Sequence, residues 1–474
     1  MSFSRLTSGF LSRVVSQGST LILLVLGAQF LTPAEFGAYT LASIAVALAN
    51  VFLFSGAYEH VLKSADLDRD GPLALSTQLL TAVLASVTLG CSGWLLKPHE
   101  ATESLGLMLQ LFSVIPLLAA TAAWREAVFL RAPDKLPAYF QIILWRDLAA
   151  LALGAGLLFL GLGLWAMVAY RMALAALGYA AFHLAHPSLC PISRRLSDIK
   201  SLLIKSMPLT GSRLLSFFGS NGMDVVVGVF LSPAAVGIYR MASRLVLAAY
   251  DIVAQPMMKH AWVHMADETR KGLTGHQSLR KAQGLSMILL AVACTYLTVS
   301  REDLVQLVLG PQWSPVVHLI PMFAAAALFT ALGQFVEPVL SLRNKGVELF
   351  RLRLCVTLLL MGSVACGAQL WQLEGAAYAK LLGSALAAAV LWWGMLRWGG
   401  VRRAIAWEAF ALAVGTSLAC LVVGLGLNSL PLDAMWRLML QALSMGALGA
   451  LFIWLFQRHQ AGTADDKHVS GSKP

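Results

Sequence analysis

The stretch FLTPAEFGAYTLAS, Phe30 to Ser43, occurs again as FLSPAAVGIYRMAS at Phe230 to Ser243, at an offset of 200 residues with no gap. At the same offset, SRVVS (starting at Ser12) is repeated as SRLLS (starting at Ser212). Each copy joins two long apolar runs through a Pro-Ala-x-x-Gly turn. An internal repeat of this kind reflects the architecture of the whole chain, and it predicts one membrane-embedded half followed by a second.

The composition assigns the apolar runs to a membrane. Of the 474 residues, 58% are hydrophobic and 12% are charged, whereas a soluble protein carries about 25% charged residues. Runs of about 18 or more apolar residues, long enough to cross a bilayer as a helix, recur along the chain. Backbone amides in hydrocarbon must pair within their own segment. The sequence therefore predicts an all-α integral membrane protein with about 14 transmembrane helices.

The repeat and the connections predict where the domains begin and end. The transmembrane helices are expected at about residues 9–31, 37–62, 75–96, 105–123, 138–160, 164–185, 210–231, 236–262, 283–300, 317–342, 350–370, 375–398, 405–427 and 435–456. The predicted domains are an N-terminal lobe at 1–187 (helices 1–6), a cytoplasmic linker at 188–208, a C-terminal lobe at 209–398 (helices 7–12), helices 13 and 14 at 405–457, and a disordered cytoplasmic tail at 458–474. The spacing of Leu196, Ile199 and Leu203 is typical of an amphipathic helix on the membrane surface.

The basic residues indicate orientation rather than a nucleic-acid partner. The net charge is +11, but most of the 35 Lys and Arg residues lie in alternate connections. The opposite connections hold few, among them Lys97 and Arg301. By the positive-inside rule the basic connections are cytoplasmic, and an even number of helices places both termini there. The cysteines are scattered without a CxxC pair, so neither disulfides nor a metal site is suggested.

Ionisable residues inside the expected helices are functional candidates, because charge in hydrocarbon is costly unless it faces a protein interior or water. The cations are Arg146, Arg171, Arg213, Arg240, Arg244 and Lys380, with Arg13 at the position that matches Arg213. The carboxylates that could neutralise them are fewer, mainly Asp147, Asp224, Asp251 and Glu337. A surplus of buried positive charge favours an anionic ligand, and guanidinium groups bind phosphate in a bidentate, charge-assisted way.

These candidates also have simpler interpretations. Arg13, Arg213 and Arg240 stand close enough to helix ends for their long side chains to reach the membrane interface. The neighbours Arg146 and Asp147 could pair with each other. Asp224 and Asp251 could serve only as counter-charges to the arginines on their own helices.

Catalytic motifs are missing from the sequence. It contains no GxSxG, HExxH or Walker loop, so no enzyme activity, cofactor or metal is expected. The longest outward connection, Arg301 to Pro315, is short for a membrane glycosyltransferase or polymerase, which needs room for its sugar substrate.

Four motifs in order resemble those of a known family. They are the two copies of the repeat, LVLGPQWSPVVHLIPMFA at Leu307 to Ala324, and LEGAAYAKLLGSALAAAV at Leu373 to Val390. They resemble the polysaccharide-transporter branch of the multidrug/oligosaccharidyl-lipid/polysaccharide (MOP) exporters, the Wzx-type flippases of bacterial surface glycans. The resemblance covers about Ser12 to Trp398.

The resemblance implies two six-helix lobes related by a pseudo-two-fold axis along the membrane normal. It also implies a central cavity, lined by helices 1, 2, 7 and 8, that opens alternately to either side. The substrate would be an undecaprenyl-diphosphate-linked oligosaccharide, with the diphosphate held by cationic residues. By position Arg13, Arg213 and Arg244 match best, followed by Arg146, Arg171, Arg240 and Lys380. Helix 2 departs from the pattern, since Thr40 and Ile44 stand where helix 8 has Arg240 and Arg244.

The leading hypothesis is thus an inner-membrane flippase for a lipid-linked glycan such as O-antigen, lipopolysaccharide or exopolysaccharide. Its partners would be that substrate, membrane lipids and other glycan-assembly membrane proteins. Three alternatives stay open: a cation-coupled exporter of small molecules from the same superfamily, a membrane glycan polymerase or ligase, and a scaffold for glycan assembly.

Overall fold

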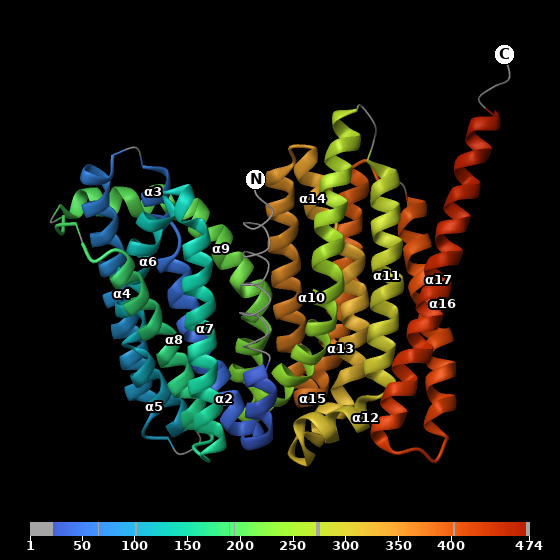
Figure 1. Cartoon of the computed structure of the whole chain (residues 1–474), viewed down its shortest axis with the longest axis horizontal. Helices are drawn as coiled ribbons and strands as arrows, with labels where there is room; N and C mark the ends of the chain where they lie inside the picture. Colours follow the sequence, from blue (N-terminus) through green and yellow to red (C-terminus); the bar gives the residue numbers. More distant parts are fainter. Residues whose placement is uncertain are drawn as a thin grey trace. The chain divides into compact units, whose positions relative to one another are not determined.

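The computed structural model describes residues 22–64, 66–99, 102–188, 190–193, 195–271, 275–401 and 403–470 (Figure 1). Within these ranges all regular secondary structure is helical and no strand occurs. The prediction of an all-α chain is therefore confirmed. The physical cause is that long apolar runs can satisfy their backbone hydrogen bonds in hydrocarbon only as helices.

The chain divides into two compact units, Met1–Gly237 and Ile238–Pro474. This division falls later in the chain than the linker predicted at residues 188–208. The two six-helix lobes and their pseudo-two-fold relation stay predictions.

The first unit contains the helices of the N-terminal half of the chain. Residues 22–30 are helical. They are followed by α2 (Pro33–Leu53), α3 (Ala57–Lys63), α4 (Leu67–Leu96), α5 (Glu103–Phe112), α6 (Ile115–Leu130), the 3-10 turn η2 (Pro133–Lys135), α7 (Leu136–Phe159), α8 (Leu164–Ala185) and α9 (Leu196–Phe230). α2 with α3 covers the second expected helix, and α5 with α6 covers the fourth. The first expected helix, at about 9–31, lies mostly outside the described residues.

The Pro-Ala-x-x-Gly turn starts a helix in each copy of the repeat. In the first copy Thr32 is the N-cap of α2: its backbone N–H donates to Glu35 Oε2 at 2.9 Å, and the Glu35 N–H donates to Thr32 Oγ1 at 3.3 Å. This reciprocal pair is a capping box, and Pro33 in the first turn loses no helical hydrogen bond. In the second copy α10 (Pro233–Arg270) also begins at its proline, and the Ala235 N–H donates to Ser232 Oγ at 3.2 Å, but Ala235 has no carboxylate to complete a capping box.

The two copies of the turn pack against each other through their glycines. A Cβ atom added to Gly37 would lie 1.6 Å from the carbonyl oxygen of Pro233. A Cβ atom added to Gly237 would lie 2.0 Å from the carbonyl oxygen of Pro33. All four residues belong to the first unit. The contact is therefore reciprocal, and each glycine allows the backbone of the other copy to approach.

The sequence predicted a separate surface helix in the linker. From Leu196 onward this prediction is wrong, because α9 runs without interruption from Leu196 to Phe230, with Pro208 inside it. Its N-terminal part is held by packing: Leu202 is buried in a cluster with Val61 of α3, Leu75 of α4 and Trp124 of α6. Ile199 of the predicted stripe is buried, but Leu203 is exposed and Leu202 is buried instead. The apolar face of this segment covers protein.

The second unit contains the remainder of α10 and the helices after it. They are α11 (His276–Val299), α12 (Arg301–Leu304), the π-helix η3 (Val305–Leu309), the 3-10 turn η4 (Pro311–Trp313), α13 (Ser314–Gly333), α14 (Val336–Leu342), α15 (Gly346–Arg397), α16 (Arg403–Asn428) and α17 (Ala434–Ser470). Trp371 and Gln372 inside α15 have non-helical backbone angles. This kink separates the two helices expected at 350–370 and 375–398.

The sequence predicted a disordered tail at residues 458–474, and the structure describes α17 as a helix up to Ser470. The polar composition of this stretch suggested a disordered tail. It contains a single glycine, Gly462, and no proline before Ser470, so no residue forces the helix to end earlier.

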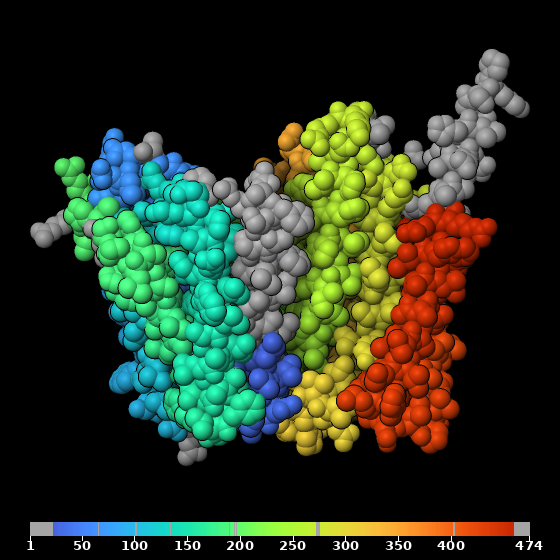
Figure 2. Space-filling view, in the orientation of Figure 1, coloured from blue at the N-terminus to red at the C-terminus, as the bar shows by residue number. Residues whose placement is uncertain are grey.

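Ten helices within the described residues are long and apolar enough to cross a membrane. α15 is counted once among them, although its kink divides it into two of the expected helices. α9 and α10 are not among the ten, because Arg213, Asp224, Arg240 and Arg244 lower their hydropathy. Large apolar side chains are exposed on the surface of α16 and α17 (red in Figure 2), among them Trp407 and Leu443. An apolar surface of this kind is what a helix in lipid requires.

Candidate functional site

A cavity of about 260 Å³ lies inside the first unit and brings predicted site residues together. It is lined by Asn50 and Phe54 of α2, Glu126 of α6, Arg146 and Asp147 of α7, and Tyr170, Arg171 and Tyr179 of α8, among others. The predicted residues Arg146, Asp147 and Arg171 therefore share one site. The two helices that supply them, α7 and α8, pack against each other.

Arg146 and Asp147 form an ion pair at this cavity. Arg146 Nε donates to Asp147 Oδ1 at 2.8 Å, and Arg146 Nη2 lies 2.7 Å from the same oxygen. Asp147 is 3% exposed, and within the described residues its Oδ2 has no hydrogen-bond partner. The pairing of these neighbours was one of the two interpretations of the sequence. A buried carboxylate with one open oxygen depends strongly on its single cation.

Replacing Arg146 with Ala is expected to lower the free energy of unfolding by about 3 kcal/mol, because it leaves Asp147 as an unpaired buried charge. The measurement is thermal unfolding of the purified protein in detergent by circular dichroism. The double variant R146A/D147A, which removes both charges, should recover most of the loss. Equal stability of the single variant and the wild type would contradict a structural role for this pair.

Glu126 is the acidic residue at this cavity that the sequence analysis missed. The hydroxyls of Tyr58 and Tyr139 both donate to Glu126 Oε1, at 3.1 and 3.2 Å. Glu126 lies beyond the fourth expected helix, which covers residues 105–123. α6 instead continues to Leu130, which carries this carboxylate inside the helix.

Arg171 differs from Arg146 because its charge is not neutralised by a neighbour. It is half-buried and lines the cavity, and within the described residues it has no ion pair or hydrogen bond. Its electrostatic neighbour is the uncharged Tyr39 of α2. An arginine in this position retains its full donor capacity for a ligand.

Arg213 of α9 lies beside the same group of residues but is already engaged. Its Nη2 lies 2.6 Å from Glu59 Oε1 of α3, and its Nη1 donates to the carbonyl oxygen of Phe54. Phe54 is the C-cap of α2, so Arg213 neutralises a helix C-terminus as well as a carboxylate. Glu59 was not among the predicted counter-charges. The side chain of Arg213 is still 40% exposed, which leaves part of the guanidinium accessible.

These residues form a connected set, which we call the polar cluster of the first unit. Phe54 links its two parts, since its carbonyl accepts from Arg213 and its side chain lines the cavity. Tyr58 makes a second link, because it stands beside Glu59 and donates to Glu126. The members of the cluster are Tyr58, Glu59, Glu126, Tyr139, Arg146, Asp147, Arg171 and Arg213.

Arg125 adds positive charge next to the polar cluster. It is 2% exposed, and its guanidinium carbon lies 5.5 Å from the centre of the Tyr179 ring. Its Nε and Nη1 have no hydrogen-bond partner within the described residues. Burial, and then the charges of Lys135 and Arg125, lower the pKa of His186 just beyond the end of α8. The electrostatic potential at this end of the unit is therefore positive.

The other predicted site residues are not in the cavity of the first unit. Arg13 lies outside the described residues. Asp224 is buried in α9. Arg240, Arg244 and Asp251 of α10 and Lys380 of α15 belong to the second unit. Asp251 is exposed, and Arg244 and Gln255 are its electrostatic neighbours on the same helix. Glu337, which the sequence offered as a further counter-charge, pairs with Arg353.

The all-α architecture, the candidate membrane-spanning helices and a charged cavity among them define a multi-pass membrane protein of transporter type. The chain matches the family model described as "Polysaccharide biosynthesis protein" over residues 26–318. This match covers more than half of the chain, and the protein belongs to that family. The family predicted from the repeat motifs is thereby confirmed.

Two solved structures show the fold. The chain is similar to "Lipid II flippase MurJ, inward closed conformation", with a TM-score of 0.77 and 14% identity, over 97% of this chain and 100% of that one. It is also similar to an inward-facing multidrug resistance MATE family transporter of the MOP superfamily, with a TM-score of 0.59 and 13% identity, over 82% and 94% of the two chains. A comparison with curated proteins gave no match.

Proposed function

We propose that this protein is a flippase that moves an undecaprenyl-diphosphate-linked oligosaccharide from the cytoplasmic to the periplasmic leaflet of the bacterial inner membrane. The product would enter the synthesis of a surface polysaccharide or exopolysaccharide. The membership of a polysaccharide biosynthesis family supports this proposal. The fold is similar to that of a structure named as a lipid II flippase, and this similarity supports the proposal that the protein works by alternating access. Both termini would be cytoplasmic.

The observation that carries the proposal is Arg171, a cation that lines a cavity among membrane-spanning helices and has no ion pair within the described residues. A half-buried guanidinium in this environment gains free energy when an anion pairs with it. A diphosphate supplies several oxygens in the geometry that arginine binds through two parallel hydrogen bonds. The cavity of about 260 Å³ would take the phosphates and not the whole glycan.

The other candidate cations would act with Arg171. Arg213 would exchange part of its contact with Glu59 for a phosphate oxygen, since its side chain is partly accessible. Arg13, Arg240, Arg244 and Lys380 would hold the substrate elsewhere on its path. Asp147, Asp224 and Asp251 would limit the electrostatic repulsion among these cations in the absence of substrate.

The decisive experiment is translocation in vesicles. The purified protein is reconstituted with an undecaprenyl-diphosphate oligosaccharide that carries a fluorescent sugar, and a membrane-impermeant quencher measures how fast the glycan changes leaflet. Arg171→Ala should lower the rate roughly tenfold or more, since a charge-assisted hydrogen bond contributes about 1.5–3 kcal/mol. Arg171→Lys should retain part of the rate, because it keeps the charge and loses the bidentate geometry.

The control for this experiment is Arg351→Ala, which removes an exposed arginine on α15. It should transport at the wild-type rate. An Arg171→Ala protein that is as active as this control would reject the proposed diphosphate site. Wild-type protein without any translocation of the lipid-linked glycan would reject the flippase itself.

A second candidate, a cation-coupled exporter of small molecules, is favoured by the carboxylates of the cavity. Glu126 uses only Oε1 in its hydrogen bonds with the two tyrosines, and its other oxygen accepts none within the described residues. A cationic substrate could bind there. Uptake of a fluorescent cationic drug into the same vesicles distinguishes the two candidates, because Glu126→Gln should abolish drug transport and Arg171→Ala should not.

The polymerase alternative receives no support from the described outward connection. Residues 301–313 form α12, η3 and η4 rather than an open loop. Leu309 and Trp313 in this segment are fully buried. The segment is therefore folded and partly packed against its own unit.

A further inference from the structure

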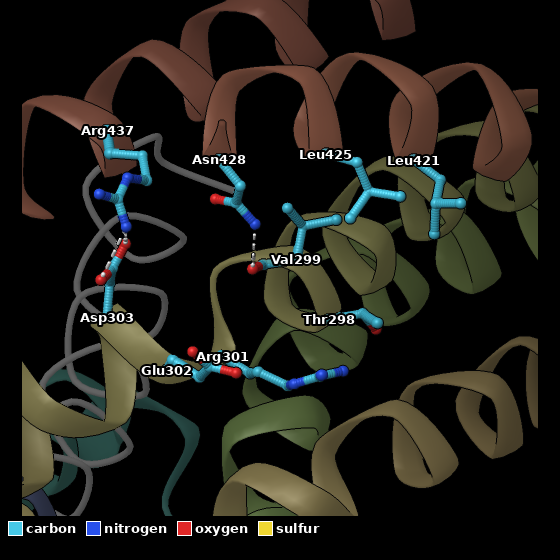
Figure 3. A pocket seen from close by; sticks show the side chains of 9 residues that line it. All are labelled: Thr298, Val299, Arg301, Glu302, Asp303, Leu421, Leu425, Asn428 and Arg437. Atoms are coloured by element: carbon cyan, nitrogen blue, oxygen red, sulfur yellow. Dashed lines mark hydrogen bonds and ion pairs between the residues drawn. The ribbon is translucent and has the colours of Figure 1, made fainter. Parts of the chain in front are cut away.

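The second unit contains another cavity, of about 280 Å³, that the proposed function does not use (Figure 3). It lies where α11 ends, α12 begins and α16 connects to α17. Its walls include Arg301 and Glu302 from α12, Leu421 and Leu425 from α16, and Arg437 from α17.

The level of this cavity in the membrane follows from the helices around it. Three candidate membrane-spanning segments end or begin here: His276–Val299, Arg403–Asn428 and Ala434–Arg458. Polar residues begin where each apolar segment stops, at Arg301, Asn428 and Arg437. Hydrocarbon therefore gives way to the headgroup region at this depth.

One wall of the cavity is apolar and open to the surface. Leu425 is 55% exposed and Leu421 is 36% exposed. They continue an exposed apolar face of α16 that includes Leu418 and Val422. Because these side chains belong to a membrane-spanning helix, acyl chains are the natural contact for this wall.

The floor of the cavity is held by contacts among its own side chains, although Arg437 Nε has no hydrogen-bond partner within the described residues. Arg437 Nη1 lies 3.1 Å from Asp303 Oδ2, and Arg437 Nη2 donates to the Leu432 carbonyl at 2.9 Å. Asn428 donates to the Val299 carbonyl at 3.4 Å and accepts from Gln441 at 2.7 Å. These bonds tie α16 and α17 to the end of α11 and to α12, so the cavity has a fixed polar frame.

Two charges in the walls are not part of that frame. Within the described residues, the side chains of Arg301 and Glu302 have no ion pair and no hydrogen bond, and only their backbone carbonyls accept bonds, from the Val305 N–H. In Figure 3 the Arg301 side chain extends along the cavity below Thr298, with Glu302 beside its backbone. Arg301 is half-buried and Glu302 is exposed. The cavity therefore offers one positive and one negative group at the headgroup level.

We propose that this cavity binds the headgroup of a zwitterionic, amine-bearing phospholipid, phosphatidylethanolamine. Arg301 binds the phosphate through charge-assisted hydrogen bonds, and the ammonium group lies near Glu302. The acyl chains run along Leu421 and Leu425. An anionic phospholipid fits less well, because Glu302 would then face a negative headgroup without a cation between them.

The volume of the cavity fits a lipid headgroup and is too small to enclose a whole lipid. Sites that enclose a drug-sized ligand have about 300–1,000 Å³, and this cavity is just below that range. The bound lipid would connect α12 with α16 and so hold the hairpin of α16 and α17 on the unit. This site is independent of the transported substrate.

The test is native mass spectrometry of the full-length protein in detergent, titrated separately with phosphatidylethanolamine and phosphatidylglycerol. The wild type should bind phosphatidylethanolamine in preference to phosphatidylglycerol. Arg301→Ala should weaken the binding of phosphatidylethanolamine roughly tenfold, the effect of one charge-assisted hydrogen bond. Glu302→Gln should weaken phosphatidylethanolamine and leave or strengthen phosphatidylglycerol.

The matched control is Arg351→Ala, an exposed arginine of the same unit, which should bind both lipids like the wild type. Unfolding temperatures of all variants show whether each one is folded. The proposal is overturned if folded Arg301→Ala binds like the wild type. It is also overturned if the wild type prefers phosphatidylglycerol, which would make this an anionic-lipid site, or binds neither lipid.

Discussion

Replacing Gly37 with Ala is expected to destabilise the protein by about 3 kcal/mol, the upper range for overpacking in a protein interior. The added methyl group would lie 1.6 Å from the Pro233 carbonyl oxygen, 2.6 Å from the carbonyl carbon and 2.8 Å from the Gly237 nitrogen. All three atoms are backbone atoms, so no side chain can rotate away. The start of α2 and the start of α10 must separate instead.

The reciprocal contact makes a second, matched prediction for Gly237→Ala. Its methyl group would meet the Pro33 carbonyl oxygen at 2.0 Å, and the loss of stability should be similar. Both variants are measured by thermal unfolding in detergent. Gly156→Ala is the control, because a Cβ atom at Gly156 would have none of the described residues within 4 Å and alanine favours a helix over glycine.

Comparison of the control with the two variants separates a clash between the turns from a general effect of replacing glycine with alanine. Gly156→Ala should unfold at the wild-type temperature or above it. Wild-type unfolding of Gly37→Ala would mean that the two turns do not approach each other in the folded protein. In that case the repeat would have no packing role at this point.

Replacing Arg213 with Ala is expected to reduce glycan translocation roughly tenfold or more, which is the second large effect. Two contacts are lost, the ion pair with Glu59 at 2.6 Å and the bond to the Phe54 carbonyl. The variant also removes one of the cations proposed to hold the diphosphate. The measurement is the vesicle assay described for Arg171.

Glu59→Gln distinguishes the phosphate-binding role of Arg213 from a structural role. It removes the carboxylate and leaves the guanidinium, so a ligand of Arg213 no longer competes with Glu59. If Arg213 binds the substrate, translocation by Glu59→Gln should stay within about threefold of the wild type. If Arg213 acts only as a clamp between α9 and α3, Glu59→Gln should lose as much activity as Arg213→Ala.

The positions of most helices could be predicted from the sequence, and the places of failure have physical causes. Hydropathy located both ends of α7 and α8, and the C-terminal end of α11, to within a few residues. It also separated the two parts of α15, where the polar pair of Gln372 and Glu374 interrupts the apolar run. The end of α6 was missed because Arg125 and Glu126 look like loop residues. Their charges are tolerated because Arg125 stacks on Tyr179 and Glu126 accepts hydrogen bonds from two tyrosines.

The candidate site could be predicted only in part. The cations Arg146, Arg171 and Arg213 stood out because charge is rare in apolar runs. Asp147 could be predicted as the partner of Arg146, but Glu59, the partner of Arg213, and the cavity residue Glu126 could not, because both lie near basic connections where acidic residues are ordinary. Whether Arg13, Arg240, Arg244 and Lys380 act with them stays a prediction.

The sequence by itself determined that this is a helical membrane protein built on a repeat, because backbone groups in hydrocarbon allow no other regular structure for such long apolar runs. It also determined which residues carry costly charge. Only the tertiary structure decided which of those charges are neutralised. Arg146 meets Asp147 and Arg213 meets Glu59, whereas Arg171 faces a cavity. Electrostatic energy depends on distances across helices, and distances between residues far apart in the chain are set by packing.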